Sequence, residues 1–170
     1  MQFAMDMSRP PVSAETDFHL ARSQSIDSFA RLEQAIIQLL EKGGVVKSAE
    51  LFSQRVELAR KLKPSPHLSK ANAELLPQLL GQCEAAACLR NDIAHAPLRF
   101  ALIEGDNFAC FVNPRQTASD SAVARLFTLE MLRTCARKWR KLADDIDDLT
   151  RKPTPQPSPQ QPSQGATTGP

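Results

Sequence analysis

The segment from residue 79 to residue 97 reads LLGQCEAAACLRNDIAHAP. Its apolar residues recur every three or four positions, as they do along one face of a helix; they are Leu79, Leu80, Cys83, Ala86 and Ala87. The same spacing, continued, reaches Arg90. Because Pro97 disfavours helical geometry in the residue before it, the sequence predicts a helix that ends at His95.

Arg90 lies on the apolar face of this helix, where a charged side chain requires an explanation. An unpaired buried charge costs several kcal/mol, so such groups are found either paired or functional. Arginine is a permanent cation that suits phosphate oxygens, and histidine exchanges a proton near neutral pH. Arg90 and His95 therefore predict a site that binds an RNA phosphate and assists attack by the neighbouring 2′-hydroxyl. In a second, structural interpretation, Arg90 bonds helix-end carbonyls or an acid such as Glu33, and His95 caps the helix.

Ideal helical geometry separates the two side chains. His95 lies about 140° further round the helix than Arg90, so the two are not expected to stack directly. The helix C-terminus carries partial negative charge, which favours the imidazolium form of histidine. We therefore expect His95 to be available as a proton donor.

Two further helices are predicted before this one. The first runs from Ser13 or Ser25 to Lys42, where two glycines stop it. The second has Ser48 as its N-cap and ends before Pro64. These two helices are predicted to form an antiparallel pair.

The third helix is expected to begin between Asn72 and Pro77, because proline is tolerated only in a first turn. After it, two short apolar runs flank the turn-forming residues 104–107, which predicts a β-hairpin. A fourth helix is predicted from Asp120, its N-cap, to Leu149. Its apolar stripe consists of Phe127, Met131, Cys135, Trp139, Leu142, Ile146 and Leu149.

The opposite side of the fourth helix carries a basic strip, defined as Arg133, Arg137, Arg140 and Lys141. This strip either contacts RNA phosphates or is an ordinary solvated helix face. Four acidic residues follow near the helix end, namely Asp144, Asp145, Asp147 and Asp148. They either bind a cation or a basic partner, or are simply solvated.

Length and composition suit one globular domain with low-complexity ends. The chain has 170 residues and a formal net charge of +2, too small to indicate a nucleic-acid binder by itself. We expect a flexible arm over residues 1–12, a helical domain over 13–150, and a disordered tail rich in Pro, Gln and Ser over 151–170. No membrane span or secretory signal is readable, so the predicted location is cytoplasmic. The four cysteines form no C-x-x-C pair and are predicted to be buried free thiols, with no metal site.

The element order and the motif Arg90-Asn91-x-x-x-His95 resemble the HEPN family. The family signature is an arginine followed about four to six residues later by a histidine, often with a polar residue directly after the arginine. The resemblance covers roughly residues 25–149. It implies an all-α, four-helix up-and-down bundle, with a short β-hairpin between helices 3 and 4, that forms a homodimer.

The resemblance also implies an activity. Active members resemble metal-independent endoribonucleases, so Arg90 is the expected phosphate and transition-state binder, His95 the general acid or base, and Asn91 the polar helper. The side chains are expected to converge with their symmetry mates in a cleft shared by two protomers. RNA is the expected partner, an antitoxin or complex subunit is a further candidate, and no cofactor is implied.

The resemblance leaves the biological role of the chain open. A toxin-antitoxin, defence or stress setting is one expectation, and a catalytically silent interaction or scaffold domain is the alternative. One HEPN subgroup carries a tyrosine two residues after the histidine. This chain has Pro97 there and contains no tyrosine, which excludes regulation by tyrosine modification.

Overall fold

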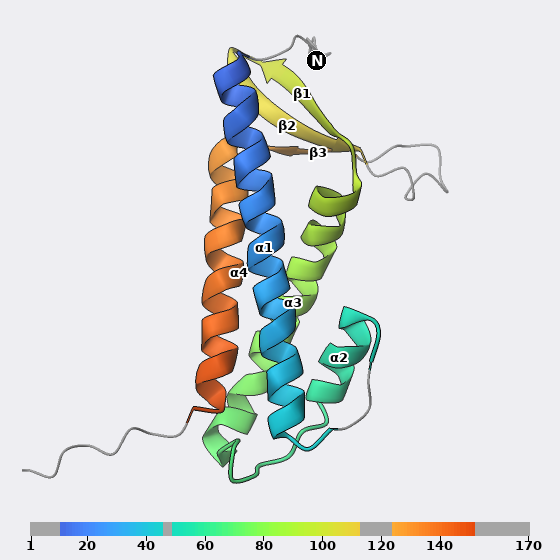
Figure 1. Ribbon diagram of the computed structural model, residues 1–170, viewed down its shortest axis with the longest axis vertical. Helices are drawn as coiled ribbons and strands as arrows, with labels where there is room; N and C mark the ends of the chain where they lie inside the picture. The colour runs from blue at the N-terminus through green and yellow to red at the C-terminus, as the bar shows by residue number, and fades with distance from the viewer. Residues whose placement is uncertain (1–10, 46–48, 113–123, 152–170) are drawn as a thin grey trace, which may run out of the picture.

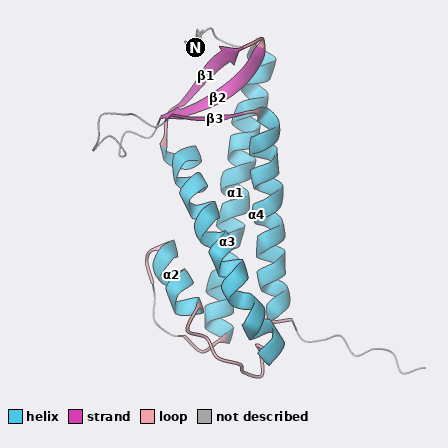
Figure 2. Ribbon diagram, turned by 180° about the vertical axis from the view of Figure 1, so that it is seen from behind, coloured by secondary structure: helices cyan, strands magenta, loops and turns pink. Residues whose placement is uncertain are grey.

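The computed structural model describes residues 11–45, 49–112 and 124–151, which are mostly helical with a small antiparallel sheet (Figure 1). The elements in chain order are α1 (Val12–Lys42), α2 (Phe52–Ala59), α3 (Lys70–His95), β1 (Leu98–Ile103), β2 (Asp106–Val112), β3 (Ala124–Phe127) and α4 (Leu129–Leu149). The sheet caps one end of three long helices, and α2 lies near the other end (Figure 2). In these ranges, no helix combines the length and apolarity that crossing a bilayer requires.

The ends of the chain fall largely outside this description. Helix α1 begins at Val12, directly after Pro11, whose fixed φ suits a helix start. The arm expected over 1–12 otherwise falls on residues 1–10, and the tail expected over 151–170 falls on residues 152–170. Both sets lie outside the described residues.

The helix directions differ from the predicted up-and-down bundle. Helices α1 and α4 are parallel: Ser25, near the middle of α1, donates to the Leu132 carbonyl near the start of α4 at 3.0 Å, and Lys42 donates to the Thr150 hydroxyl at the ends of both at 2.8 Å. Helix α3 is antiparallel to α4, because the Asn72 amide near the start of α3 donates to Leu149 O at the end of α4. Among these three long helices, α3 therefore runs in the opposite direction to α1 and α4.

Helix α2 is parallel to α1, so the predicted antiparallel pair is wrong. Phe52 at the start of α2 contacts Phe29 in the middle of α1, with ring centroids 5.0 Å apart. Leu62, just after α2, lies against Gly43 at the end of α1. The eight residues of α2 span about 12 Å, too short to act as a full bundle helix. The predicted N-cap, Ser48, lies outside the described residues.

The core centres on the ring of Phe29. This ring packs edge-on against Trp139 of α4, at a centroid distance of 5.6 Å, and against Phe52 of α2. Phe29 and Trp139 are buried, and edge-to-face packing of aromatic rings adds to the stabilisation that burial itself gives. Three helices thus meet on one side chain.

The predicted hairpin is confirmed as the first part of a three-stranded antiparallel sheet in the order β1-β2-β3. Glu104 and Gly105 form its turn with φ of 54° and 89°, as a two-residue hairpin turn with positive φ at both positions requires. The unpredicted β3 pairs with β2, placing Phe127 opposite Ala109. Phe111 and Phe127 then stack edge-on beneath the sheet, 5.5 Å apart.

Helix α3 ends at His95 as predicted but begins earlier than predicted, at Lys70. The Ser69 hydroxyl caps it by accepting the Asn72 N–H at 3.2 Å. Pro77 therefore lies inside the helix and not in its first turn. The buried Leu76 and Leu80 on either side of Pro77 hold the helix across the missing backbone hydrogen bond.

Helix α4 begins at Leu129, later than the predicted start at Asp120, which lies outside the described residues. Phe127, expected on the helical stripe, belongs to β3 because its backbone pairs with β2. The Thr128 hydroxyl accepts the Met131 N–H at 3.1 Å and so caps α4. The predicted helix end at Leu149 is confirmed.

We predict that Thr128→Ala lowers the free energy of unfolding by about 1 kcal/mol, because the first turn of α4 loses its cap. Thr128→Asn should retain most of the stability, since an asparagine side chain also accepts that N–H. Urea denaturation followed by circular dichroism measures both. Equal losses in the two variants would contradict a capping role for Thr128.

Candidate functional site

Arg90, Asn91 and His95 come together at the last two turns of α3. One Arg90 Nη1 atom lies 3.2 Å from Asn91 Oδ1 and 3.2 Å from His95 Nε2. Asn91 and His95 are exposed and Arg90 is half-buried. Direct stacking of the arginine and histidine was not expected; in the structure the long arginine side chain reaches round the helix and contacts the imidazole through Nη1.

The contact between them has a direction. A guanidinium N–H can only donate, so Arg90 Nη1 is the donor in its contact with His95 Nε2. In this arrangement Arg90 occupies the nitrogen that would otherwise take or give a proton.

Arg90 also rests on the centre of the core. Its Cζ atom lies 5.4 Å from the centroid of the Phe29 ring, within the range of cation–π attraction. None of the ion pairs in the described ranges involves Arg90, and neither Glu33 nor a helix-end carbonyl is among its partners. Arg90 is thus a half-buried cation that touches an amide, an imidazole and an aromatic face.

The role of bonding the helix-end carbonyls belongs to Arg22 of α1. Its guanidinium donates to the carbonyls of Ile93, Ala94 and Ala96, at 2.8, 3.0 and 3.1 Å, and it lies 5.7 Å from the Phe111 ring. Burial lowers the pKa of Arg22. Sequence reasoning missed this residue, although Arg22 interrupts an apolar helical face in the same way as Arg90.

A second missed residue, Asp92, lies inside the motif itself. Its carboxylate is buried, and Oδ2 lies 2.6 Å from Arg125 Nε in an ion pair that joins α3 to β3. The Asp92 side chain is 4 % exposed, whereas the Arg125 side chain is 40 % exposed. A charged residue two positions after the motif arginine was the available signal, but the strand that carries its partner was not predicted.

The basic strip of α4 is divided between paired and unpaired residues. Arg137 pairs with Glu130 at 2.6 Å and lowers the pKa of that carboxyl, mainly through their hydrogen bond. Lys141 pairs with Asp145 at 2.6 Å. Arg133 and Arg140 make no ion pair within the described ranges. No hydrogen bond or ion pair there connects the strip with Arg90 or His95.

The acidic run at the end of α4 is largely engaged in ion pairs. Asp144 pairs with Arg31, Asp145 with Lys141, and Asp148 with Arg151. Over the described part of the chain, no group of three or more His, Cys, Asp or Glu residues is arranged to hold a metal ion. Three of the four acidic residues therefore form ion pairs on the helix surface.

The cysteines are free, but they are not all buried as predicted. Cys83 and Cys110 are buried, Cys135 is half-buried and Cys88 is exposed. Burial raises the pKa of the Cys83 thiol to about 12. Cys88 lies on the outer face of α3, where its side chain meets solvent.

Comparison with family models, with curated proteins and with solved structures finds no match to this chain. The function must therefore be argued from the arrangement of the residues themselves.

We predict that Arg22→Met lowers the free energy of unfolding by about 2–4 kcal/mol, because three carbonyls at the end of α3 lose a charged donor. Arg31→Met on the same helix is the matched control. Its exposed pair with Asp144 should contribute less than about 1 kcal/mol. Chemical denaturation compares the two, and similar losses would show that Arg22 does not hold the end of α3.

We also predict that a thiol reagent at neutral pH modifies Cys88 in the folded protein and modifies Cys83 only after unfolding. The Cys83 thiol is buried and protonated, whereas the thiolate is the reactive form. Mass spectrometry of the labelled peptides assigns each site. Cys88→Ser should abolish the fast phase, and rapid labelling of Cys83 in the native state would contradict its burial.

Proposed function

We propose that this chain is a HEPN-like, RNA-directed protein and a metal-independent endoribonuclease whose site consists of Arg90, Asn91 and His95. The observation that carries the proposal is the half-buried Arg90 cation, which lacks a carboxylate partner in the described ranges and touches His95 at 3.2 Å. A cation held without a counter-ion suits an anionic ligand. An adjacent imidazole suits proton transfer at that ligand.

The proposed reaction begins when an RNA phosphate takes the hydrogen-bond donors of Arg90. Arg90 then leaves His95 Nε2, whose lone pair becomes available to accept the proton of the 2′-hydroxyl. The 2′-oxygen attacks phosphorus, the bond to the 5′-oxygen breaks, and the departing oxygen takes up a proton from water. Arg90 stabilises the charge that develops on the phosphate oxygens. The products are a 2′,3′-cyclic phosphate and a 5′-hydroxyl end.

Asn91 serves in this proposal as the second anchor of the guanidinium. Its Oδ1 accepts from the same Nη1 that contacts His95. An amide oxygen directs the guanidinium without neutralising it, so the positive charge stays available to phosphate. An aspartate at residue 91 would pair with Arg90 and compete with RNA.

The remaining elements of the proposal concern assembly. A homodimer would place two motifs in one cleft and provide a second imidazole as the general acid, although Arg90 and His95 already meet within one chain. Arg133 and Arg140 of the basic strip are the candidates for further phosphate contacts. Regulation by an antitoxin or complex subunit in a cytoplasmic toxin-antitoxin, defence or stress setting fits such an activity.

A specific observation favours the alternative of a catalytically silent scaffold. Arg90 rests on Phe29, the ring on which α1, α2 and α4 meet. A cation–π contact at that point stabilises the core irrespective of RNA. The two functions differ in their dependence on His95, which is exposed and adds little to packing.

We predict that the purified protein cleaves total RNA in the presence of a chelator and leaves cyclic phosphate ends. His95→Ala should reduce the rate about 100- to 10,000-fold, because the proton-transfer group is lost, with little change in stability. Arg90→Lys keeps a charge but loses the planar fork, and should also be strongly impaired. Rates come from gel analysis and the ends from end mapping.

His67→Ala is the matched control, since His67 is exposed and precedes the start of α3 at Lys70, whereas His95 is the last residue of that helix. It should cleave RNA like the wild type. Absence of cleavage by the wild type, or equal rates for wild type and His95→Ala, would eliminate the ribonuclease and leave the scaffold. In that case Arg90→Lys should affect only the unfolding free energy.

A further inference from the structure

Helices α3 and α4 diverge toward the sheet (Figure 2). Side chains of both helices line two hollows, of about 520 and 620 Å³, and Lys138 of α4 lines both. We call these two hollows together the α3–α4 groove. Among the α4 side chains that line the two hollows, Met131 and Leu149 are about 27 Å apart at the helical rise per residue.

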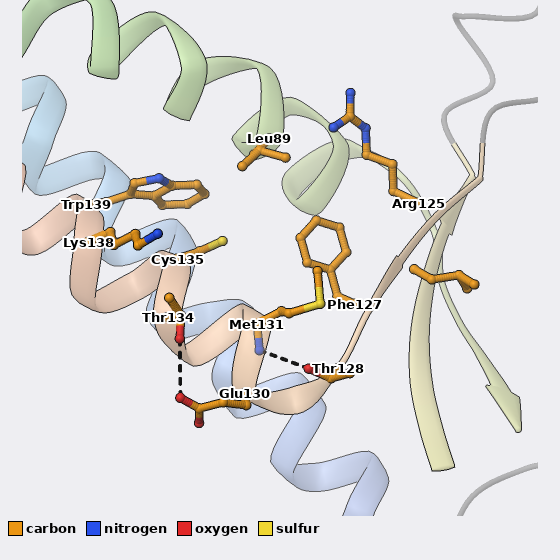
Figure 3. Close-up of a pocket in the computed structure, with 11 residues that line it drawn as sticks. Leu89, Arg125, Phe127, Thr128, Glu130, Met131, Thr134, Cys135, Lys138 and Trp139 are labelled. Atoms are coloured by element: carbon orange, nitrogen blue, oxygen red, sulfur yellow. Dashed lines mark hydrogen bonds between the residues drawn. The ribbon is translucent and has the colours of Figure 1, made fainter. Parts of the chain in front are cut away.

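The end of the groove next to β3 is apolar. Figure 3 shows Leu89 from α3, Phe127 from β3, and Met131 and Trp139 from α4 around one space. Leu126 is 36 % and Met131 47 % exposed, which is unusual for large apolar side chains gathered at one place. The far end has a similar apolar side chain, Leu75, at 52 % exposure.

The charges that line the groove are balanced except at its middle. Arg125 pairs with Asp92, Glu130 with Arg137, Lys141 with Asp145, and Asp148 with Arg151. Lys138 alone among the charged lining residues makes no ion pair in the described ranges. The groove therefore presents exposed apolar side chains at its two ends and one uncompensated positive charge between them.

We propose that the α3–α4 groove binds an amphipathic helix of a partner protein, with an acidic residue of that helix opposite Lys138. The groove is long and bounded by two helices, so a third helix fits it with apolar residues at i, i+3, i+4 and i+7. The carboxylate of the partner supplies the charge that Lys138 lacks. Polar complementarity of this kind sets the choice of partner more than the total affinity.

A second copy of this chain is a poorer occupant. A symmetric dimer that buries the same groove on both protomers places its twofold axis near the middle of the interface. Lys138 lines both hollows, so it would meet the Lys138 of the other copy there. Like charges brought together oppose association.

The test uses two synthetic helical peptides of about 18 residues, a length that matches the groove at the helical rise. Both carry the same leucine stripe, flanked by glutamates in the acidic peptide and by lysines in the basic peptide. The full-length protein should bind the acidic peptide about tenfold more tightly than the basic one in fluorescence anisotropy. The experiment contains no RNA, so the inference stands or falls independently of the proposed ribonuclease.

Three substitutions locate the binding. Lys138→Glu should reverse the preference between the peptides, whereas Arg133→Glu makes the same charge change on α4 at a residue that lines neither hollow and should preserve it. Met131→Asp should weaken both peptides, and its exposed position protects the fold, which circular dichroism checks.

Four results would overturn the proposal. The first is no binding of the acidic peptide, and the second is equal binding of the two peptides to the wild type. The third is an equal shift of preference in Lys138→Glu and Arg133→Glu, which would reduce the effect to net charge. The fourth is a wild-type dimer that Met131→Asp dissociates in sedimentation experiments, which would assign the groove to a second copy.

Discussion

The candidate site depends on the end of α3, which the guanidinium of Arg22 holds in place. The last carbonyls of a helix have no partner within it, and in α3 those of Ile93, Ala94 and Ala96 receive their hydrogen bonds from Arg22 on another helix. This contact ties the end of α3, where Pro97 disfavours further helix, to α1. His95 is the final residue of that helix, and β1 begins three residues later. The imidazole and the start of the sheet therefore both lie beside the helix end that Arg22 holds.

Arg22 and Arg90 show how the same residue type on an apolar helix face takes different roles. Arg22 uses its Nε and Nη2 donors on backbone carbonyls at the end of α3. Arg90 has only an amide oxygen and one imidazole nitrogen as hydrogen-bond acceptors, both of which a phosphate can displace. Its contact with Phe29 constrains the guanidinium without supplying negative charge. Hydrogen-bonding partners, and not helical position, separate the structural arginine from the candidate functional one.

The sequence predicted those features that local chemistry determines. The end of α3 was readable because Pro97 acts on its neighbour, and the β1–β2 turn because Gly105 permits positive φ. The strand β3 was not readable, because its four residues depend on pairing with β2. That pairing also shifted the start of α4, and the direction of α2 depended on the contact between Phe29 and Phe52. The meeting of Arg90 with His95 was missed because helical angles describe Cβ directions, whereas a long side chain can turn back across them.

The final turns of α3 connect the two surfaces to which functions are assigned. Arg90 lies over the Phe29 ring of α1, while Asp92 reaches Arg125 beside the α3–α4 groove. An ion pair with a buried carboxylate resists separation, since breaking it strands a charge away from water. The ion pair therefore ties the helical turn that contains Arg90 and Asn91 to the strand β3, which lines the groove.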